Sequence, residues 1–164
     1  TLFRSSMYTL ADILNDKCET LDIRGVAHKG FFASITDFPS YYAANMALLN
    51  YKSAQELFHD NWPIYTRTND SCPTQYFNTA DVKNSVISNG CQIEGTVENS
   101  VIGRGCVIKK GAVVRNSVVL AEVTVGEGVH VENEVVDKWA NLIHKKEIVS
   151  PAEQPGYIRR NDTL

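Results

Sequence analysis

The sequence predicts a mainly β protein: a parallel β-helix of hexapeptide repeats, preceded by a small α/β segment. Aromatic residues (6 Phe, 7 Tyr and 2 Trp in the chain) are absent between Asn78 and Lys138. Seven of the ten glycines and 15 valines lie between Val82 and Val136. Within this stretch an aliphatic residue recurs every six positions, which is typical of a β-helix.

In each repeat a small or β-branched residue follows the aliphatic one by four positions. We expect each unit to form a short strand and a turn, and three units to form one coil of about 18 residues. The aliphatic side chains then stack along the coil axis, and the narrow interior excludes aromatic rings. The alternative, a β-sandwich, would alternate with period two over longer runs. The pairs are Ile87/Cys91, Ile93/Val97, Ile102/Cys106, Ile108/Ala112, Val125/Val129 and Val131/Val135.

The repeat region sets the expected domain boundaries. Residues 80–149 supply roughly four coils, within a β-helix domain that we place at 80–164. The six-residue pattern breaks at 98–100 and at 115–117, where we expect slightly longer turns. Residues 61–79 show no sustained period and are predicted to be a linker.

Residues 1–60 are expected to form the α/β segment. Apolar residues at helical spacing predict a short helix over 8–14. The β-rich run 21–35, broken by Gly25 and by the Lys29-Gly30 turn signal, predicts two short strands.

Two further helices are predicted from capping signals. Asp37 or Thr36 at the N-cap, with Pro39 in the first turn, predicts a helix over 40–50. Ser53 and Glu56 form a capping box, which predicts a helix that ends near His59.

Composition and charge exclude several classes of protein. The net charge is −3 without a basic stripe, which argues against a nucleic-acid partner. There is no apolar run that could span a bilayer and no signal-peptide pattern. The cysteines form no C-x-x-C pair and have no histidine at zinc-ligand spacing, so we expect reduced, mostly buried thiols in a cytoplasmic protein. They are Cys18, Cys72, Cys91 and Cys106.

His130 and His144 are the histidines in or near the coils. A hexapeptide-repeat acyltransferase needs a histidine as general base, and a β-helix carbonic anhydrase needs three around zinc. We expect His130 on an outward turn position without a partner at metal spacing, and a surface or structural role for both histidines. Three paired cations could hold a phosphate, although such pairs usually form a solvated face: Lys109-Lys110, Lys145-Lys146 and Arg159-Arg160.

Two motifs precede the repeat region, residues 30–37 (GFFASITD) and 40–49 (SYYAANMALL). They resemble the end of the catalytic domain of one family, the bacterial ADP-glucose pyrophosphorylases (glucose-1-phosphate adenylyltransferases), where the patterns are G-[YF]-W-x-D-[VI]-G-T and S-[YF]-x-x-A-N-x-x-L. Residues 82–91, 96–102 and 111–119 are similar to the family's left-handed β-helix. The resemblance implies that residues 1–60 are the C-terminal remnant of a nucleotidyltransferase domain.

The chain also departs from the family's pattern. The acidic residue that binds the catalytic Mg²⁺ in the family is Ser34 here, and the following glycine is Thr36. This pattern is similar to the D-type subunit of glycogen synthesis in low-GC Gram-positive bacteria, regarded as a non-catalytic or regulatory partner. The chain begins at Thr1 without the family's Gly-rich nucleotide motif, so we interpret it as a C-terminal fragment.

The run from Gly156 to Arg159 resembles the family's G-Y-[FY]-I-[KR] strand, whose cation contributes to an allosteric effector site. The resemblance implies that Arg159 binds an anionic effector, a sugar phosphate or inorganic phosphate. The family's S-G-I-V continuation is replaced here by residues 160–162 (RND).

These observations predict the regulatory and oligomerisation part of a glucose-1-phosphate adenylyltransferase subunit in glycogen biosynthesis. It would support a catalytic partner subunit in a hetero- or homo-oligomer, without a nucleic-acid or membrane partner. We expect no catalysis and no cofactor in this segment, with Mg²⁺ only in the catalytic partner. The alternatives are a hexapeptide-repeat acyltransferase with His130 as general base, and another sugar-nucleotide pyrophosphorylase such as a GDP-mannose type, which the A-N-x-x-L helix disfavours.

Overall fold

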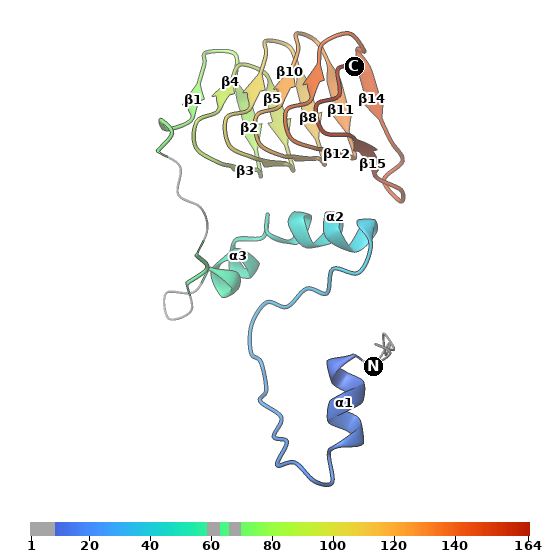
Figure 1. Cartoon of the computed structure of the whole chain (residues 1–164). Helices are drawn as coiled ribbons and strands as arrows, with labels where there is room; N and C mark the ends of the chain where they lie inside the picture. The colour runs from blue at the N-terminus through green and yellow to red at the C-terminus, as the bar shows by residue number, and fades with distance from the viewer. Residues whose placement is uncertain (1–8, 59–62, 66–69) are drawn as a thin grey trace.

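The computed structural model describes residues 9–58, 63–65 and 70–164 and confirms the predicted parallel β-helix (Figure 1). The described strands form three parallel sheets of five strands, which we call sheets 1, 2 and 3. Sheet 1 contains β1 (Gln75–Tyr76), β4 (Gln92–Ile93), β7 (Val107–Ile108), β10 (Thr124–Val125) and β13 (Asn141–Leu142). Sheet 2 contains β2 (Asp81–Lys83), β5 (Thr96–Glu98), β8 (Val113–Arg115), β11 (His130–Glu132) and β14 (Glu147–Val149). Sheet 3 contains β3 (Val86–Ile87), β6 (Val101–Ile102), β9 (Val118–Val119), β12 (Glu134–Val136) and β15 (Gly156–Ile158).

The core is one column of aliphatic side chains inside the coils. In sheet 1, Ile93, Ile108 and Val125 are neighbours in register and have no exposed surface. Each buried side chain of this kind contributes about 1.5–3 kcal/mol. The residue four positions after an aliphatic one is also buried at a corner, as at Cys91 and Cys106. The stacking predicted from the six-residue spacing is therefore confirmed.

The coils are shorter than the expected 18 residues. Register partners in neighbouring coils are mostly 17 residues apart, as for Val107 and Thr124. The prediction of longer turns at 98–100 and 115–117 is wrong, because these corners are tight: β5 ends at Glu98 and β6 begins at Val101. Asn99 takes a positive φ of 46° there and turns the chain within two residues.

This tight corner repeats through the coils as an Asn–Ser ladder. Asn84, Asn99, Asn116 and Asn133 all have positive φ, a conformation that asparagine tolerates better than most residues. The next residue links neighbouring coils by hydrogen bonds. Ser100 Oγ donates to the Glu98 carbonyl (2.7 Å) and accepts from the backbone N–H of Ser117 (3.1 Å). Ser117 Oγ makes the same two bonds one coil further on, to the Arg115 carbonyl and from Glu134 N–H.

The ladder ends at a buried carboxyl group. Glu134 stands where the preceding corners have serine, and it is only 4% exposed. Ser150 Oγ donates to its Oε1 at 2.6 Å. A side chain on Gly156, its register partner, would collide with the carboxylate and with Ser150 Oγ, so glycine leaves the space that this pair occupies. Burial raises the pKa of Glu134, and the Ser150 bond and the charge of Lys145 oppose this rise only in part.

Among the described residues, three helices precede the coils: α1 (Leu10–Asp16), α2 (Phe38–Ala47) and α3 (Tyr51–Leu57). Asp37 caps α2 as predicted, and its side chain accepts from Ser40 N. The predicted Ser53 cap is wrong, because α3 begins earlier, where the Asn50 side chain accepts from two backbone N–H groups. No helix in the described ranges is long and apolar enough to cross a membrane. Tyr8 and His59, at the ends of two predicted helices, lie outside the described residues.

The two strands expected over 21–35 are absent from the structure, so that prediction is wrong. A strand needs a neighbour that completes its hydrogen-bond ladder, and this segment has no such neighbour within the described chain. By contrast β1, Gln75–Tyr76, lies in the segment expected to be a linker and pairs with β4. Tyr76 takes the register position of Ile93 in this first coil, where it is 54% exposed and needs no room inside.

Helix α2 lies along sheet 3 and connects the first segment to the coils (Figure 1). Tyr42 Oη donates to the Asn116 carbonyl at a ladder corner. Phe38 packs edge-on against Tyr157 of β15, with ring centroids 5.9 Å apart. The far end of the coils is covered by the C-terminus, where Leu164 packs against the core and Thr163 pairs with Asn141.

Removing a ladder hydroxyl should destabilise the coils. Ser117→Ala leaves the buried N–H of Glu134 unpaired, so we expect the free energy of unfolding in urea to fall by about 1–3 kcal/mol. Ser85→Ala is the matched control, because Ser85 occupies the same position in the partly exposed first coil, where water can replace its hydroxyl. Equal losses from the two variants would contradict a ladder that depends on burial.

The buried carboxyl group should make stability depend on pH. Because the pKa of Glu134 is raised, the folded protein binds this proton more tightly than the unfolded chain, whose ordinary pKa is 4.5. This contribution is full below that pKa and is lost as the pH rises through the folded pKa. We therefore expect Glu134→Gln to be more stable than the wild type at pH 7 and the difference to shrink towards pH 4.5, as measured by thermal unfolding. Glu127→Gln, at an exposed turn, should show no such trend.

Candidate functional site

The corner that follows β12 and β15 gathers cations, an anion and two aromatic rings. Val136 and Ile158 are register partners, so the residues after them lie side by side. Asp137 N donates to the Ile158 carbonyl (3.0 Å), and Asn161 N donates to the Lys138 carbonyl (3.1 Å). We define this group as the C-terminal corner cluster: Asp137, Lys138, Trp139, Tyr157, Arg159 and Arg160.

Asp137 is the centre of the cluster. Its Oδ1 accepts from the backbone N–H of Lys138 (2.7 Å), and its Oδ2 accepts from Tyr157 Oη (2.9 Å). The Lys138 bond is the main cause of a lowered pKa of Asp137; the Tyr157 bond and the charge of Arg160 add to it. The hydrogen bond from Tyr157 to Asp137 raises the pKa of Tyr157, because an ionised phenol could no longer donate to this carboxylate. Asp137 is therefore held as an anion, and Tyr157 is held as a donor.

The two arginines differ in how far the cluster engages them. Arg160 lies over the ring of Trp139, 5.3 Å from its centroid, and its Nε is 3.9 Å from Asp137 Oδ2. Arg159, the predicted effector residue, is exposed, and its side chain makes no hydrogen bond or ion pair within the described residues. With Lys138 and Arg160, it gives the corner three cations, against the carboxylates of Asp137 and of Asp162, whose backbone N–H donates to the Arg159 carbonyl. This arrangement can attract an anion such as phosphate.

The predictions for the two histidines in or near the coils have a mixed outcome. We expected His130 on a turn, but it lies on strand β11. The 17-residue coil places it there in register with Val113 and Glu147. Its Nε2 lies 3.1 Å from Glu132 Oε2 and forms no hydrogen bond in the described structure. His144 follows β13 and donates its backbone N–H to the Leu164 carbonyl. Nothing brings the two histidines together as a catalytic pair.

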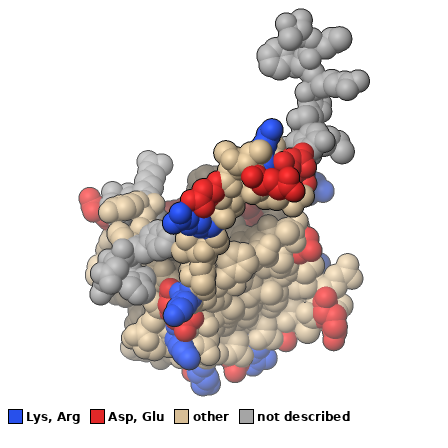
Figure 2. Space-filling model, turned by 90° about the horizontal axis from the view of Figure 1, so that it is seen from below, with Lys and Arg blue, Asp and Glu red and all other residues tan. Residues whose placement is uncertain are grey.

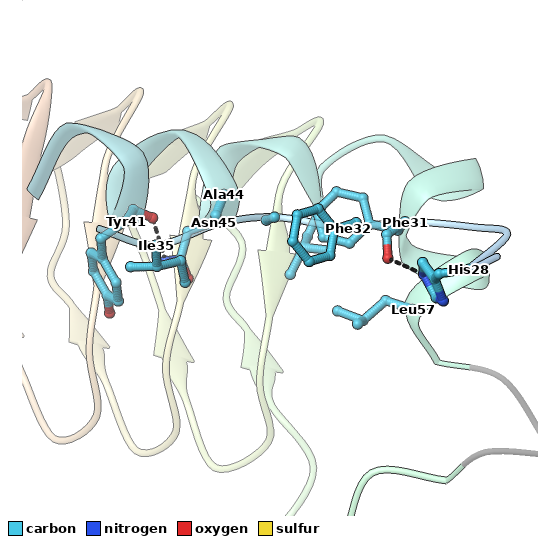
Figure 3. Close-up of a pocket in the computed structure, with 10 residues that line it drawn as sticks. His28, Phe31, Phe32, Ile35, Tyr41, Ala44, Asn45 and Leu57 are labelled. Atoms are coloured by element: carbon cyan, nitrogen blue, oxygen red, sulfur yellow. Dashed lines mark hydrogen bonds between the residues drawn. The ribbon is translucent and has the colours of Figure 1, made fainter. Parts of the chain in front are cut away.

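Ser34 is exposed and stands in the chain between Ala33 and Ile35, which line an apolar groove. Figure 3 shows this groove. The groove has a volume of about 690 Å³ and is bounded by α2, α3 and residues 28–35. Phe31, Phe32 and Ile35 contribute to it, and Asn45 Nδ2 donates to the Tyr41 carbonyl at its edge. Figure 2 shows this side of the molecule, largely uncharged at its centre with charged side chains near the rim. Among the described residues no three His, Cys, Asp or Glu side chains gather in a way that could hold a metal ion.

All four cysteines carry free thiols, but the prediction that these thiols are mostly buried holds for only two of them. Cys91 and Cys106 are buried in neighbouring coils, where their Sγ atoms lie 3.1 and 3.0 Å from carbonyl oxygens of the next coil. Cys18 and Cys72 are exposed.

The sequence analysis named Arg159 as a candidate but did not name the residues around it. Asp137 and Trp139 are two positions apart, and Tyr157 follows them by 20 and 18 positions, so only the register of β12 with β15 brings the three together. One signal was available: Trp139 and Tyr157 are the first aromatic residues after the ring-free stretch, so they mark positions outside the coil interior.

The fold and the repeat define a hexapeptide-repeat protein with an added helical segment packed on one sheet. Residues 73–154 match the family described as "GlmU-like, C-terminal hexapeptide", and this match covers half of the chain. The chain therefore belongs to that family.

Its relatives confirm the resemblance to the glucose-1-phosphate adenylyltransferases. The chain is 37% identical over 108 residues to a glucose-1-phosphate adenylyltransferase of Fervidobacterium nodosum, covering 66% of this chain and 26% of the relative. It is 31% identical over 152 residues to the glycogen biosynthesis protein GlgD of Bacillus subtilis, covering 93% of this chain and 44% of the relative. A GlgD of Geobacillus stearothermophilus is 37% identical over 107 residues, covering 65% and 31%. The chain spans less than half the length of these curated relatives.

Proposed function

We propose that this chain acts in glycogen biosynthesis as the regulatory and assembly part of a glucose-1-phosphate adenylyltransferase subunit that supports a catalytic partner. The observation that carries the proposal is the match along 93% of the chain to a protein named glycogen biosynthesis protein GlgD. That match spans the helical segment as well as the coils, so it is more specific than the hexapeptide repeat alone.

The contact between α2 and sheet 3 supports an assembly role. The helix is fixed to the coils by the Tyr42–Asn116 hydrogen bond and the Phe38–Tyr157 ring contact. Together with α3 and residues 28–35, the helix also lines the apolar groove near Ser34. In this proposal the coils are a rigid support, and α2 transmits their position to the nucleotidyltransferase core that the family resemblance implies. Ser34 in place of the family's metal-binding carboxylate supports a non-catalytic subunit, because a neutral hydroxyl is a weaker Mg²⁺ ligand.

The C-terminal corner cluster supports regulation by an anion. Phe38 of α2 contacts Tyr157, whose hydroxyl group bonds to Asp137 beside the arginines. An anion held by Arg159 would therefore lie one side chain away from the helix that joins the coils to the rest of the subunit. In this proposal the effector is a sugar phosphate or inorganic phosphate.

A hexapeptide-repeat acyltransferase is the competing function, with His130 as general base. The buried Nε2 of His130 beside the Glu132 carboxylate is the feature that favours it, since a carboxylate can orient a catalytic imidazole. An acyl-CoA turnover assay on this chain separates the two functions. Turnover that His130→Ala abolishes would establish the acyltransferase and overturn the regulatory role.

The regulatory role predicts dependence on a catalytic subunit. The protein that contains this chain should synthesise little ADP-glucose alone, and Ser34→Asp should not restore synthesis by itself. Mixed with a catalytic glucose-1-phosphate adenylyltransferase subunit, it should co-purify and change the rate or the effector dependence of ADP-glucose synthesis. Strong activity of the isolated protein, or failure to co-purify, would contradict the proposal.

The effector site predicts a specific loss at Arg159. Arg159→Ala should weaken the response of the mixed enzyme to phosphate or sugar phosphate about tenfold or more, because a charge-assisted bidentate bond contributes about 1.5–3 kcal/mol. Basal activity without effector should not change. Lys110→Ala removes an exposed cation far along the coils and is the matched control. An unchanged response in Arg159→Ala would remove this residue from the site.

A further inference from the structure

The outward face of sheet 2 carries a row of charges whose sign alternates from coil to coil. The strand pairing places four residues in register along this row. We call the row the charge ladder: Lys83, Glu98, Arg115 and Glu132. A second row runs beside it, two positions earlier in each strand: Asp81, Thr96, Val113 and His130.

The charge ladder is on the surface. Its side chains are 63% exposed at Lys83, 37% at Glu98, 46% at Arg115 and 28% at Glu132. Helix α2 lies against sheet 3 and not against this face (Figure 1). Within the chain, the ladder side chains form isolated ion pairs, such as the pair of Arg115 Nε with Glu98 Oε2 at 3.2 Å. Exposed pairs of this kind contribute little to folding, so the regular alternation needs another explanation.

The order of charges is complementary to itself when it is reversed. A two-fold axis parallel to the strands, between β5 and β8, turns a second copy face to face with the first and reverses its coil order. Lys83 then faces Glu132 of the second copy, and Glu98 faces Arg115 of the second copy. In the neighbouring row, Asp81 faces His130 of the second copy. Every charge of the ladder receives an opposite charge.

The other face-to-face two-fold arrangement does not match as well. An axis parallel to the coil axis keeps the coil order and brings the two rows against each other. Glu98 then faces Thr96 of the second copy, and Arg115 faces Val113 of the second copy. Two of the four ladder charges are left without a partner, so the reversed arrangement is favoured.

We propose that the charge ladder is a self-association surface, on which a second copy of this chain docks face to face in antiparallel coil order. The ladder spans four coils at about 4.8 Å per strand, which is small compared with standard protein interfaces. The dimer is therefore weak by itself and sensitive to salt. The surface is independent of the role in glycogen biosynthesis proposed above.

Two complementary charge reversals test the arrangement. Arg115→Glu alone places glutamate against Glu98 of the second copy, and Glu98→Arg alone places arginine against Arg115. Sedimentation velocity in about 0.05 M salt, at chain concentrations from about 0.01 to 1 mM, should show dimers for the wild type and at least about tenfold weaker association for each variant. An equimolar mixture of the two variants should form dimers again, because each charge of one then faces an opposite charge of the other.

The mixture separates association from effects within one chain, since no single chain in it regains the native pair. Lys109→Glu carries the same change of charge beside sheet 1 and should leave association unchanged. Should a reversal fail to fold by circular dichroism, the salt dependence of the wild type provides the test: raising salt to about 0.5 M should weaken the dimer about tenfold or more. A wild type that stays monomeric at about 1 mM, an association that ignores salt, or variants that do not associate when mixed would overturn the proposal.

Discussion

The fold depends on the width of the coil interior. Parallel strands about 4.8 Å apart leave room inside each coil for one aliphatic side chain per strand and for small residues at the corners. Ile93, Ile108 and Val125 fill this space without any exposed surface. An aromatic ring does not fit, and a polar group can enter only with a hydrogen-bond partner. The six-residue period, the abundance of valine and the absence of rings from 79 to 137 all follow from this one restriction.

The Asn–Ser ladder shows what such an interior requires at a corner. Shortening the coil to 17 residues needs a backbone with positive φ, which asparagine accepts, as at Asn116. It also brings backbone N–H groups of the next coil inside, where they need an acceptor. The hydroxyls of Ser100 and Ser117 supply that acceptor while their own protons bond to the preceding strand. The corner therefore stabilises both the turn and the register between coils.

The sequence predicted the repeated part of the molecule well and the rest less well. Inward positions such as Ile102 follow from a local period that every coil repeats. The corner at Asn99 was misread as a longer turn, because a break in a period does not say whether a residue has been added or removed. The strands expected over 21–35 failed for another reason: strand propensity says nothing about whether a pairing neighbour exists. The residues around Arg159 were not predictable, since residues about 20 positions apart meet only when the coil register is known.

Chemical variety in this chain is concentrated where the repeat ends. The last step of sheet 3 is 22 residues long, not 17, and the extra residues form the loop that begins at Ser150. There the ladder serine becomes Glu134, and Trp139 adopts a positive φ of 62° that is rare for a bulky residue. The positive φ itself belongs to a corner that the regular coils repeat, since Glu122 one coil earlier and Gly105 two coils earlier have φ of 61° and 67° at the equivalent position, so what changes at Trp139 is the side chain. Glu134 and Trp139 border this irregular step, where the next strand places Gly156 opposite Glu134 and leaves space for the carboxyl group. The longer loop therefore allows a buried carboxyl group and a corner that holds aromatic and cationic side chains together.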